Sequence, residues 1–326
     1  MSRERRPRKR AAGSGAGSPR DETRPVQYDH IEPLAFGGTL PNAPSFEQAK
    51  AVILPVPLES TTSYVPGTRN GPREILVAST HLELWDEETG TDIHPIGIYT
   101  LPEMELPFDD LKDIMAEIGR VTAAILEHGK FPIVLGGEHS ITPPLVEAAA
   151  RKHPGLHVLQ IDAHADLRDT YMGTRFSHAC AMRRVVECAR ATQVGIRSMS
   201  TEEAQIAASL PTRIFYDVSM REDPHWIARV VESLGETVYI TIDVDGMDPA
   251  IMPATGTPEP GGLSWYELLA LLRGVISART VVGCDIVELS PLPGIVAPNF
   301  LCAKLIYKIL TYQFSKDLKI YRSLDL

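Results

Sequence analysis

Short apolar runs rich in β-branched residues alternate with segments of helical periodicity from about residue 50 onward, and this alternation constrains the fold more than any other feature. The runs are almost continuously apolar, as expected for strands that a sheet buries on both faces. Such strands, separated by helices, are typical of a parallel sheet covered by helices on both sides. The expected strands are Ala51–Val56, Ile96–Thr100, Pro132–Leu135, His157–Ile161, Thr192–Ile196, Arg213–Tyr216, Val238–Ile242 and Val281–Ile286.

Helical segments are expected near residues 110–129, 141–152, 178–189, 202–209, 225–234, 264–278 and 297–315. This order predicts the α/β class, as a three-layer αβα sandwich around a doubly wound, mostly parallel sheet of about eight strands. A TIM barrel is the competing topology, because it uses the same alternation of strand and helix. No break in composition divides residues 27–326, so we expect them to form a single catalytic domain.

Residues 1–26 differ from this body, because they are rich in Arg, Gly, Ser, Ala and Pro and have almost nothing to bury. We expect a disordered basic tail, since such a segment cannot offset the entropy of ordering. Its basic run at residues 5–10 has two interpretations, a nuclear signal or nucleic-acid arm and a solvated, dispensable tail.

The body after the tail is acidic. Residues 1–25 have eight basic and three acidic side chains, so the −10 net charge of the whole chain leaves −15 on the 301 residues that follow. An acidic body is a poor nucleic-acid binder but suits metal cations or a cationic substrate. No apolar run approaches the roughly 18–20 residues that cross a bilayer. The four cysteines include no C-x-x-C pair, which indicates a reduced, cytoplasmic protein.

Ionisable residues gather directly after three of the expected strands. In open parallel sheets the ligand site lies beyond the carboxyl ends of the strands, so these segments are expected to meet at one edge. The three segments are Gly136-Gly137-Glu138-His139-Ser140, Asp162-Ala-His164-Ala-Asp166 and Asp243-Val-Asp245-Gly-Met-Asp248-Pro.

The second segment is the most informative, because Asp162, His164 and Asp166 at a spacing of two point to one face of an extended chain. Asp243 and Asp245 repeat the arrangement at another strand end. Carboxylates held this close repel one another and raise their own pKa values, and a pair of bound cations removes that repulsion. With two imidazoles, the set is rich in oxygen donors and favours Mn²⁺ over Zn²⁺. Two such ions generate a nucleophile from water at neutral pH.

Each segment also has a simpler interpretation. An Asp-x-Asp at a strand end is usually a turn or a helix N-cap, and Asp248-Pro249 fits that description. A His after a Gly-Gly turn is more often a structural group than a ligand. A phosphate cradle at Gly136-Gly137 lacks both glycine-rich phosphate motifs. The occurrence of all three segments at strand ends of one domain favours the metal site.

At these residues the chain resembles the ureohydrolase superfamily of arginases, agmatinases and guanidinobutyrases, and most closely its bacterial and archaeal agmatinase-like branch. The resemblance covers about residues 45–316. It is carried by the three segments above and by Pro66-Gly67-Thr68-Arg69-x-Gly71-Pro72-Arg73, Ser177-His178-Ala and Glu288-Leu-Ser-Pro.

The resemblance implies two Mn²⁺ ions per subunit, with Asp162 and Asp243 bridging them. One ion would have the ligands His139, Asp162, Asp166 and Asp243, and the other Asp162, His164, Asp243 and Asp245.

The resemblance also implies three catalytic roles. Asp166 would hold the bridging hydroxide by a hydrogen bond. Glu288 would pair with the guanidinium, for which a carboxylate offers two parallel acceptors. His178 would carry a proton to the leaving amine, since its pKa is near neutral. A simpler interpretation of His178 is a surface residue in the first turn of a helix. A simpler interpretation of Glu288 is a residue that forms a salt bridge.

The implied reaction converts a guanidino group to urea and an amine, and agmatine is the leading substrate, with putrescine as the product. Residues 167–176 lack the Asn and Ser pattern by which arginases hold an α-carboxylate and α-amine, which argues against arginine. Arg168 and Arg175 in this loop would suit a carboxylate such as 4-guanidinobutyrate, unless both are surface residues.

Two further alternatives stay open at this point. One is an inactive ureohydrolase-like scaffold, and the other is a two-metal deacetylase, which would need a His-Asp dyad that we do not identify. The resemblance implies a homo-oligomer, often a trimer or hexamer. We expect a small cationic guanidino substrate and neither nucleic acid nor membrane as a partner.

Overall fold

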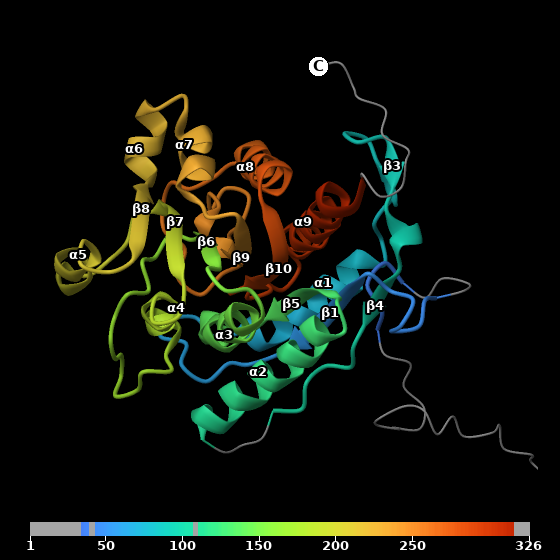
Figure 1. The fold of residues 1–326 in the computed structure, drawn as a ribbon, viewed down its shortest axis with the longest axis horizontal. Coiled ribbons are helices and arrows are strands. Elements are labelled where there is room, and N and C mark those ends of the chain that lie inside the picture. The colour runs from blue at the N-terminus through green and yellow to red at the C-terminus, as the bar shows by residue number, and fades with distance from the viewer. Residues whose placement is uncertain (1–33, 39–42, 107–109, 316–326) are drawn as a thin grey trace, which may run out of the picture. The chain divides into compact units, whose positions relative to one another are not determined.

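The computed structural model describes residues 34–38, 43–106 and 110–315, so the predicted tail at 1–26 lies outside the described residues. Eight strands form one sheet in the order β4-β1-β5-β10-β9-β6-β7-β8, and every neighbouring pair is parallel (Figure 1). The strands are β1 (Ala51–Val56), β4 (Ile98–Thr100), β5 (Phe131–Gly136), β6 (His157–Ile161), β7 (Arg190–Ile196), β8 (Thr212–Tyr216), β9 (Thr237–Asp243) and β10 (Thr280–Val287).

All eight predicted strands are therefore present. The sheet is open, with β4 and β8 at its two edges, so the competing TIM barrel is wrong. Strand residues alternate between two apolar clusters, with Ile53 and Ile133 in one and Val52 and Val134 in the other. These side chains are fully buried, and burying each one contributes about 1.5–3 kcal/mol.

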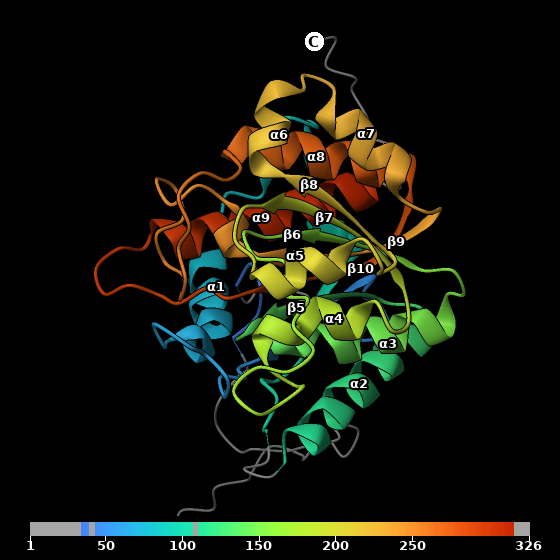
Figure 2. The same cartoon turned by 90° about the vertical axis from the view of Figure 1, so that its left-hand side faces the viewer.

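Helices cover both faces of the sheet, which confirms the three-layer αβα sandwich (Figure 2). One face packs against α2 (Leu111–Glu127), α3 (Thr142–Lys152), α4 (Ala181–Val185) and α5 (Thr201–Ala207). The other packs against α1 (Gly71–Ser79), α6 (Asp217–Glu222), α7 (Trp226–Ser233), α8 (Trp265–Ala278) and α9 (Ala297–Phe314). No helix within the described ranges is long and apolar enough to cross a bilayer.

Three local features differ from the expectation. Helix α1 begins at Gly71, in a segment for which no helix was expected, because Pro72 fits the first turn, where a missing N–H costs nothing. The expected helix at 178–189 is a 3₁₀ turn, η4 (His178–Cys180), followed by the short α4. A small antiparallel pair, β2 (Trp85–Asp86) and β3 (Thr91–Asp92), and helix α6 were not expected.

The strand order creates a switch point in the middle of the sheet. Strands β5 and β6 follow each other in the chain, yet β10 and β9 lie between them. After β6 the chain continues through α4 on one face to β7, whereas after β9 it continues through α8 on the other face to β10, so the loops after β6 and β9 diverge. A ligand crevice is expected where such loops separate, beyond the carboxyl ends of the central strands.

Candidate metal centre

The carboxyl ends of three central strands place the six predicted ligands. His139 begins the 3₁₀ turn η3 (His139–Ile141) after β5, and Asp162 directly follows β6. Asp243 is the last residue of β9, and Asp245 lies in the next 3₁₀ turn, η5 (Val244–Gly246). The close packing of these ends depends on Gly137, where an added Cβ would lie 1.9 Å from the carbonyl oxygen of Leu58.

One group of ligands surrounds His139. Its Nδ1 atom lies 3.1 Å from Asp162 Oδ2, 3.0 Å from Asp166 Oδ2 and 3.5 Å from Asp243 Oδ2. All four side chains are buried. This is the geometry of donor atoms that converge on a common point.

A second group surrounds His164. Its Nδ1 atom lies 2.9 Å from Asp245 Oδ2 and 3.7 Å from Asp162 Oδ1. Within each of the sets His139–Asp162–Asp243 and Asp162–His164–Asp245, one donor atom per residue lies within 4.8 Å of the others. Asp162 belongs to both sets and turns a different oxygen toward each imidazole, which suits a carboxylate between two cations.

The environment of His139 tests whether cations fit. The Thr241 hydroxyl donates to Asp285 Oδ1 at 2.7 Å, so it can only accept from His139 Nε2, which lies 3.0 Å away. Nδ1 therefore has the free lone pair, and it is buried without a hydrogen-bond partner among the described residues. In the neutral ring this lone pair faces three carboxylate oxygens and needs a proton or a metal cation between them, so the residues fit a bound metal.

The charges of the site give the same result. Burial raises the pKa of Asp243 well above its ordinary range, and the charges of Asp245 and Asp162 raise it further. Burial also raises the pKa of Asp166, to about 6. Burial alone would lower the pKa of His164, but hydrogen bonds to Asp162 and Asp245 raise it to about 12. The protein alone must take up protons to neutralise this cluster, whereas two divalent cations supply the same positive charge.

The backbone around Asp166 differs from the expected extended segment. Strand β6 ends at Ile161, and Asp166 has a φ of 52°, in the left-handed region that non-glycine residues rarely adopt. Its carboxylate still reaches His139, so the predicted convergence is present but a strained loop produces it. Glu288, directly after β10, has a φ of 64°. Strain at such residues clusters at functional sites, where the surrounding structure holds it in place.

Glu288 and His178 occupy the same end of the sheet. Glu288 is buried, its Oε1 accepts from the backbone N–H of His139 at 2.6 Å, and burial raises its pKa well above the ordinary range. Among the described residues no lysine or arginine forms an ion pair with it. His178 begins η4, which lies beside η3, and burial lowers its pKa. The structure thus brings both predicted residues to the loops that hold the ligands.

Two amides that the sequence did not single out support Asp162. Gln160 Nε2 donates to Asp162 Oδ2 at 2.6 Å, and Gln193 Nε2 donates to Gln160 Oε1 at 2.5 Å. Both amides are buried in the sheet. The available signal was a polar residue at a fully buried strand position, which needs a partner.

Arg197, also not singled out, fastens the loop after β9. Its guanidinium donates to the carbonyl oxygens of Asp245 at 2.7 Å, Glu259 at 2.9 Å, Pro260 at 3.0 Å and Gly195 at 3.1 Å. The five donors of an arginine fork suit this task. The side chain thereby fixes the main chain of a candidate ligand.

Two arginines considered for substrate binding have protein partners. Arg175 forms an exposed ion pair with Glu187 at 2.9 Å. Arg168 lies over the ring of Tyr171, 5.1 Å from its centroid, and Tyr171 meets His178 edge to face at 6.0 Å. Arg168, whose Nε atom also lies 3.7 Å from Glu203 Oε2, is thus one aromatic ring away from His178, whereas Arg175 pairs with an acidic side chain on the surface.

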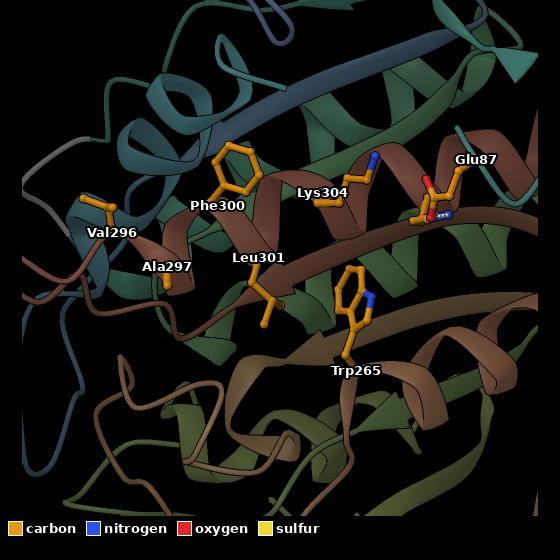
Figure 3. A pocket seen from close by; sticks show the side chains of 8 residues that line it. Glu87, Trp265, Val296, Ala297, Phe300, Leu301 and Lys304 are labelled. Carbon is orange, nitrogen blue, oxygen red and sulfur yellow. Dashed lines mark hydrogen bonds and ion pairs between the residues drawn. The ribbon is translucent and has the colours of Figure 1, made fainter. Parts of the chain in front are cut away.

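A separate open groove of about 490 Å³ lies along α9 (Figure 3). Its lining is largely apolar and includes Trp265, Val296, Phe300 and Leu301. It contains none of the six candidate ligands. We therefore place the chemistry at the strand ends and not in this groove.

Comparisons with known proteins identify the family of the chain. The sequence model of the Arginase family matches residues 49–311. An N(1)-aminopropylagmatine ureohydrolase from Synechocystis sp. is 41% identical over 276 residues, which cover 82% of this chain and 90% of that protein. An agmatinase from Bacillus subtilis is 35% identical over 253 residues, which cover 76% of this chain and 86% of that protein. The agmatine ureohydrolase of Thermoplasma volcanium superposes with a TM-score of 0.79 at 32% identity, covering 88% and 97% of the two chains.

Proposed function

The chain belongs to the arginase family, and we propose that it hydrolyses the guanidino group of a small cationic substrate of the agmatine type to urea and an amine. The observation that supports this most directly is the pair of imidazole–carboxylate groups that share Asp162. An inactive scaffold would have no reason to keep two such groups buried against their own repulsion.

We assign two Mn²⁺ ions to this centre. In this assignment Asp162 and Asp243 would each hold both ions, and the oxygen-rich donor set supports manganese. The ions, when bound, would lower the pKa of water enough to supply a nucleophilic hydroxide at neutral pH. The proposed ligands are His139, Asp162, Asp166 and Asp243 for one ion and Asp162, His164, Asp243 and Asp245 for the other.

Three side chains then act on the substrate and its protons. Glu288 pairs with the planar guanidinium and orients its carbon toward the nucleophile. Asp166 accepts a hydrogen bond from the attacking oxygen and fixes its direction. His178 passes a proton to the amine that leaves. Burial lowers the pKa of His178, which favours the neutral ring that is able to take up that proton first.

The choice of substrate rests on the charges around the site. Agmatine leads, and N(1)-aminopropylagmatine belongs to the same class, since both pair a guanidino group with a cationic amine chain. Arg175 is engaged with Glu187, which leaves it a poor anchor for a substrate carboxylate. Arg168, beside Tyr171, keeps a guanidino acid such as 4-guanidinobutyrate as the second candidate. A cytoplasmic homo-oligomer, trimeric or hexameric, stays a prediction.

A substrate panel tests the proposal. The Mn²⁺-loaded protein is assayed for urea release from agmatine, N(1)-aminopropylagmatine, 4-guanidinobutyrate, 3-guanidinopropionate and arginine, with metal content measured on the same sample. We expect the highest kcat/KM for one of the two cationic amines. Preference for a guanidino acid would favour the second candidate. Two bound Mn²⁺ ions without urea from any of the five compounds would overturn the proposal.

A further inference from the structure

The buried carboxylate of Glu138 is neither a proposed metal ligand nor a proposed catalytic group. Glu138 lies between Gly137 and His139 but turns toward the loop after β1. Its Oε2 accepts from the backbone N–H groups of Ser60 at 2.7 Å and Thr61 at 2.6 Å. Its Oε1 accepts from the hydroxyls of Thr61 at 2.8 Å and Ser140 at 2.5 Å. All four contacts are donors, so the carboxylate serves purely as an acceptor.

The Thr61 hydroxyl connects this carboxylate to His178. Its Oγ1 atom accepts from the backbone N–H of His178 at 3.0 Å and lies 3.2 Å from the Nδ1 atom of the same residue. Three segments far apart in the sequence therefore meet at one oxygen atom: the loop after β1, the turn after β5 and the start of η4.

The direction in which the Thr61 hydroxyl donates its proton determines the tautomer of the His178 imidazole. A carboxylate oxygen can only accept, so Thr61 must give its proton to Glu138. The Thr61 oxygen, at 3.2 Å, is then an acceptor toward Nδ1, and the Ser177 hydroxyl, 3.5 Å from the same atom, can also accept from it, so the neutral ring of His178 has its proton on Nδ1. Its Nε2 atom has the free lone pair, at 3.4 Å from the Ser63 hydroxyl, which is on the exposed side of the loop.

From this geometry we infer that Thr61 and Glu138 are positioning residues, which hold His178 in the tautomer whose Nε2 exchanges protons with the leaving amine. The inference rests on the proposed role of His178. The carboxylate orients the hydroxyl, and the hydroxyl fixes both the backbone and the ring of His178. Groups that orient metal-ligating histidines typically contribute about 10–100-fold to activity, and we expect an effect of the same order for the groups that orient His178.

Substitution of Thr61 tests this inference. Thr61→Val keeps the shape of the side chain and removes the hydroxyl, and we expect kcat for urea release to fall about 10–100-fold. KM and the Mn²⁺ content should stay within about twofold of the unmodified protein, because neither Thr61 nor its proposed partner is a metal ligand. Thr61→Ser keeps the hydroxyl and should restore most of kcat.

A matched control and a double variant separate positioning from general damage. Thr122→Val makes the same change at a buried threonine of α2, whose hydroxyl donates to the Ile118 carbonyl oxygen, and it should leave kcat unchanged. In a His178→Ala background, Thr61→Val should cost less than about twofold, since its effect acts through the missing ring.

Two results would overturn the inference: a kcat of Thr61→Val equal to that of the unmodified protein, or the full loss repeated in the His178→Ala background. If Thr61→Val does not fold, Thr61→Ala removes the same hydroxyl with a smaller side chain, and the same two criteria apply. Failure of the proposed function is distinct, because the unmodified protein itself would then release no urea.

Discussion

The guanidinium of Arg197 donates a 2.7 Å hydrogen bond to the main-chain carbonyl of Asp245, whose carboxylate lies 2.9 Å from His164. One side chain outside the candidate ligand set thus holds the backbone of a member of that set. Arg197 follows the end of β7, so the contact joins the loops of two strands that are not neighbours in the sheet.

Replacing Arg197 with Met should destabilise the protein and weaken its metal binding. The four carbonyl groups that Arg197 contacts within 3.1 Å, two of them in buried residues, lose a charged donor, and hydrogen bonds to charged groups contribute about 1.5–3 kcal/mol each. We expect Tm to fall by several degrees and the Mn²⁺ dissociation constant to rise at least about tenfold. Differential scanning calorimetry and titration calorimetry measure the two quantities. Arg190→Met, at an exposed position of β7, is the control and should change neither.

Asp245→Asn should reduce the bound Mn²⁺ from about two ions to about one per chain. The substitution removes one negative ligand from the group around His164 and leaves the group around His139 intact. We expect kcat for urea release to fall at least about 100-fold, more than the loss of an orienting residue produces. Metal analysis after dialysis gives the stoichiometry. Asp248→Asn changes an aspartate that caps the Ala250 N–H, and it should keep both ions.

The affinity for Mn²⁺ should rise with pH. In the metal-free protein the pKa of His164 is raised to about 12 and that of Asp166 to about 6, so an ion must displace protons from both. Each proton displaced makes the affinity about tenfold higher per pH unit. The contribution of Asp166 ends above about pH 6, whereas that of His164 persists through neutral pH. Dissociation constants at pH 5.5, 6.5 and 7.5 (roughly one unit apart) check this; equal values would contradict it.

The raised pKa of Asp166 makes the stability of the metal-free protein depend on pH. Because folding raises the pKa of Asp166 from 3.8 to about 6, its contribution to the free energy of unfolding is complete below about pH 4. The contribution is lost as the pH rises through about 6. Bound ions compensate for this loss, so Mn²⁺ should raise Tm more at pH 7 than at pH 5. An equal rise in Tm at the two pH values would show that a group other than Asp166 determines how the stability depends on pH.

A buried ion pair outside the site also predicts a large effect. Lys308 of α9 is 2.7 Å from Asp86 of β2, and both side chains are almost fully buried. Lys308→Met leaves Asp86 without its partner, and the loss of one member of a buried pair costs about 3–5 kcal/mol. Chemical denaturation at neutral pH measures it. The double variant Lys308→Met with Asp86→Asn removes the unpaired charge and should recover part of the loss; no recovery would contradict this explanation.

The strands and the six candidate ligands could be predicted because their signals are local. A buried parallel strand is a continuous apolar run, and the ligands follow such runs directly, as Asp162 follows Ile161. The left-handed backbone at Asp166 could not be predicted, because it depends on the loops packed around it and not on a neighbouring glycine.

The residues that support the candidate site could not be predicted, for a different reason. Thr61 and Arg197 act through contacts with residues distant in the chain, and a single threonine or arginine has no pattern that marks such a contact. Helix α1 was not predicted because Gly71-Pro72 usually marks a loop, although Pro is favoured in a first helical turn.

The place of β9 and β10 in the sheet has a consequence for synthesis of the protein. A nascent chain that has emerged only as far as β8 has two separate half-sheets, β4-β1-β5 and β6-β7-β8, each with an unpaired inner edge. The last two strands to leave the ribosome must insert between these edges. Asp243 and Asp245 arrive with them, so the candidate metal centre is incomplete until both halves of the sheet are joined. Binding of metal to the chain would then indicate that β9 and β10 have inserted between the two half-sheets.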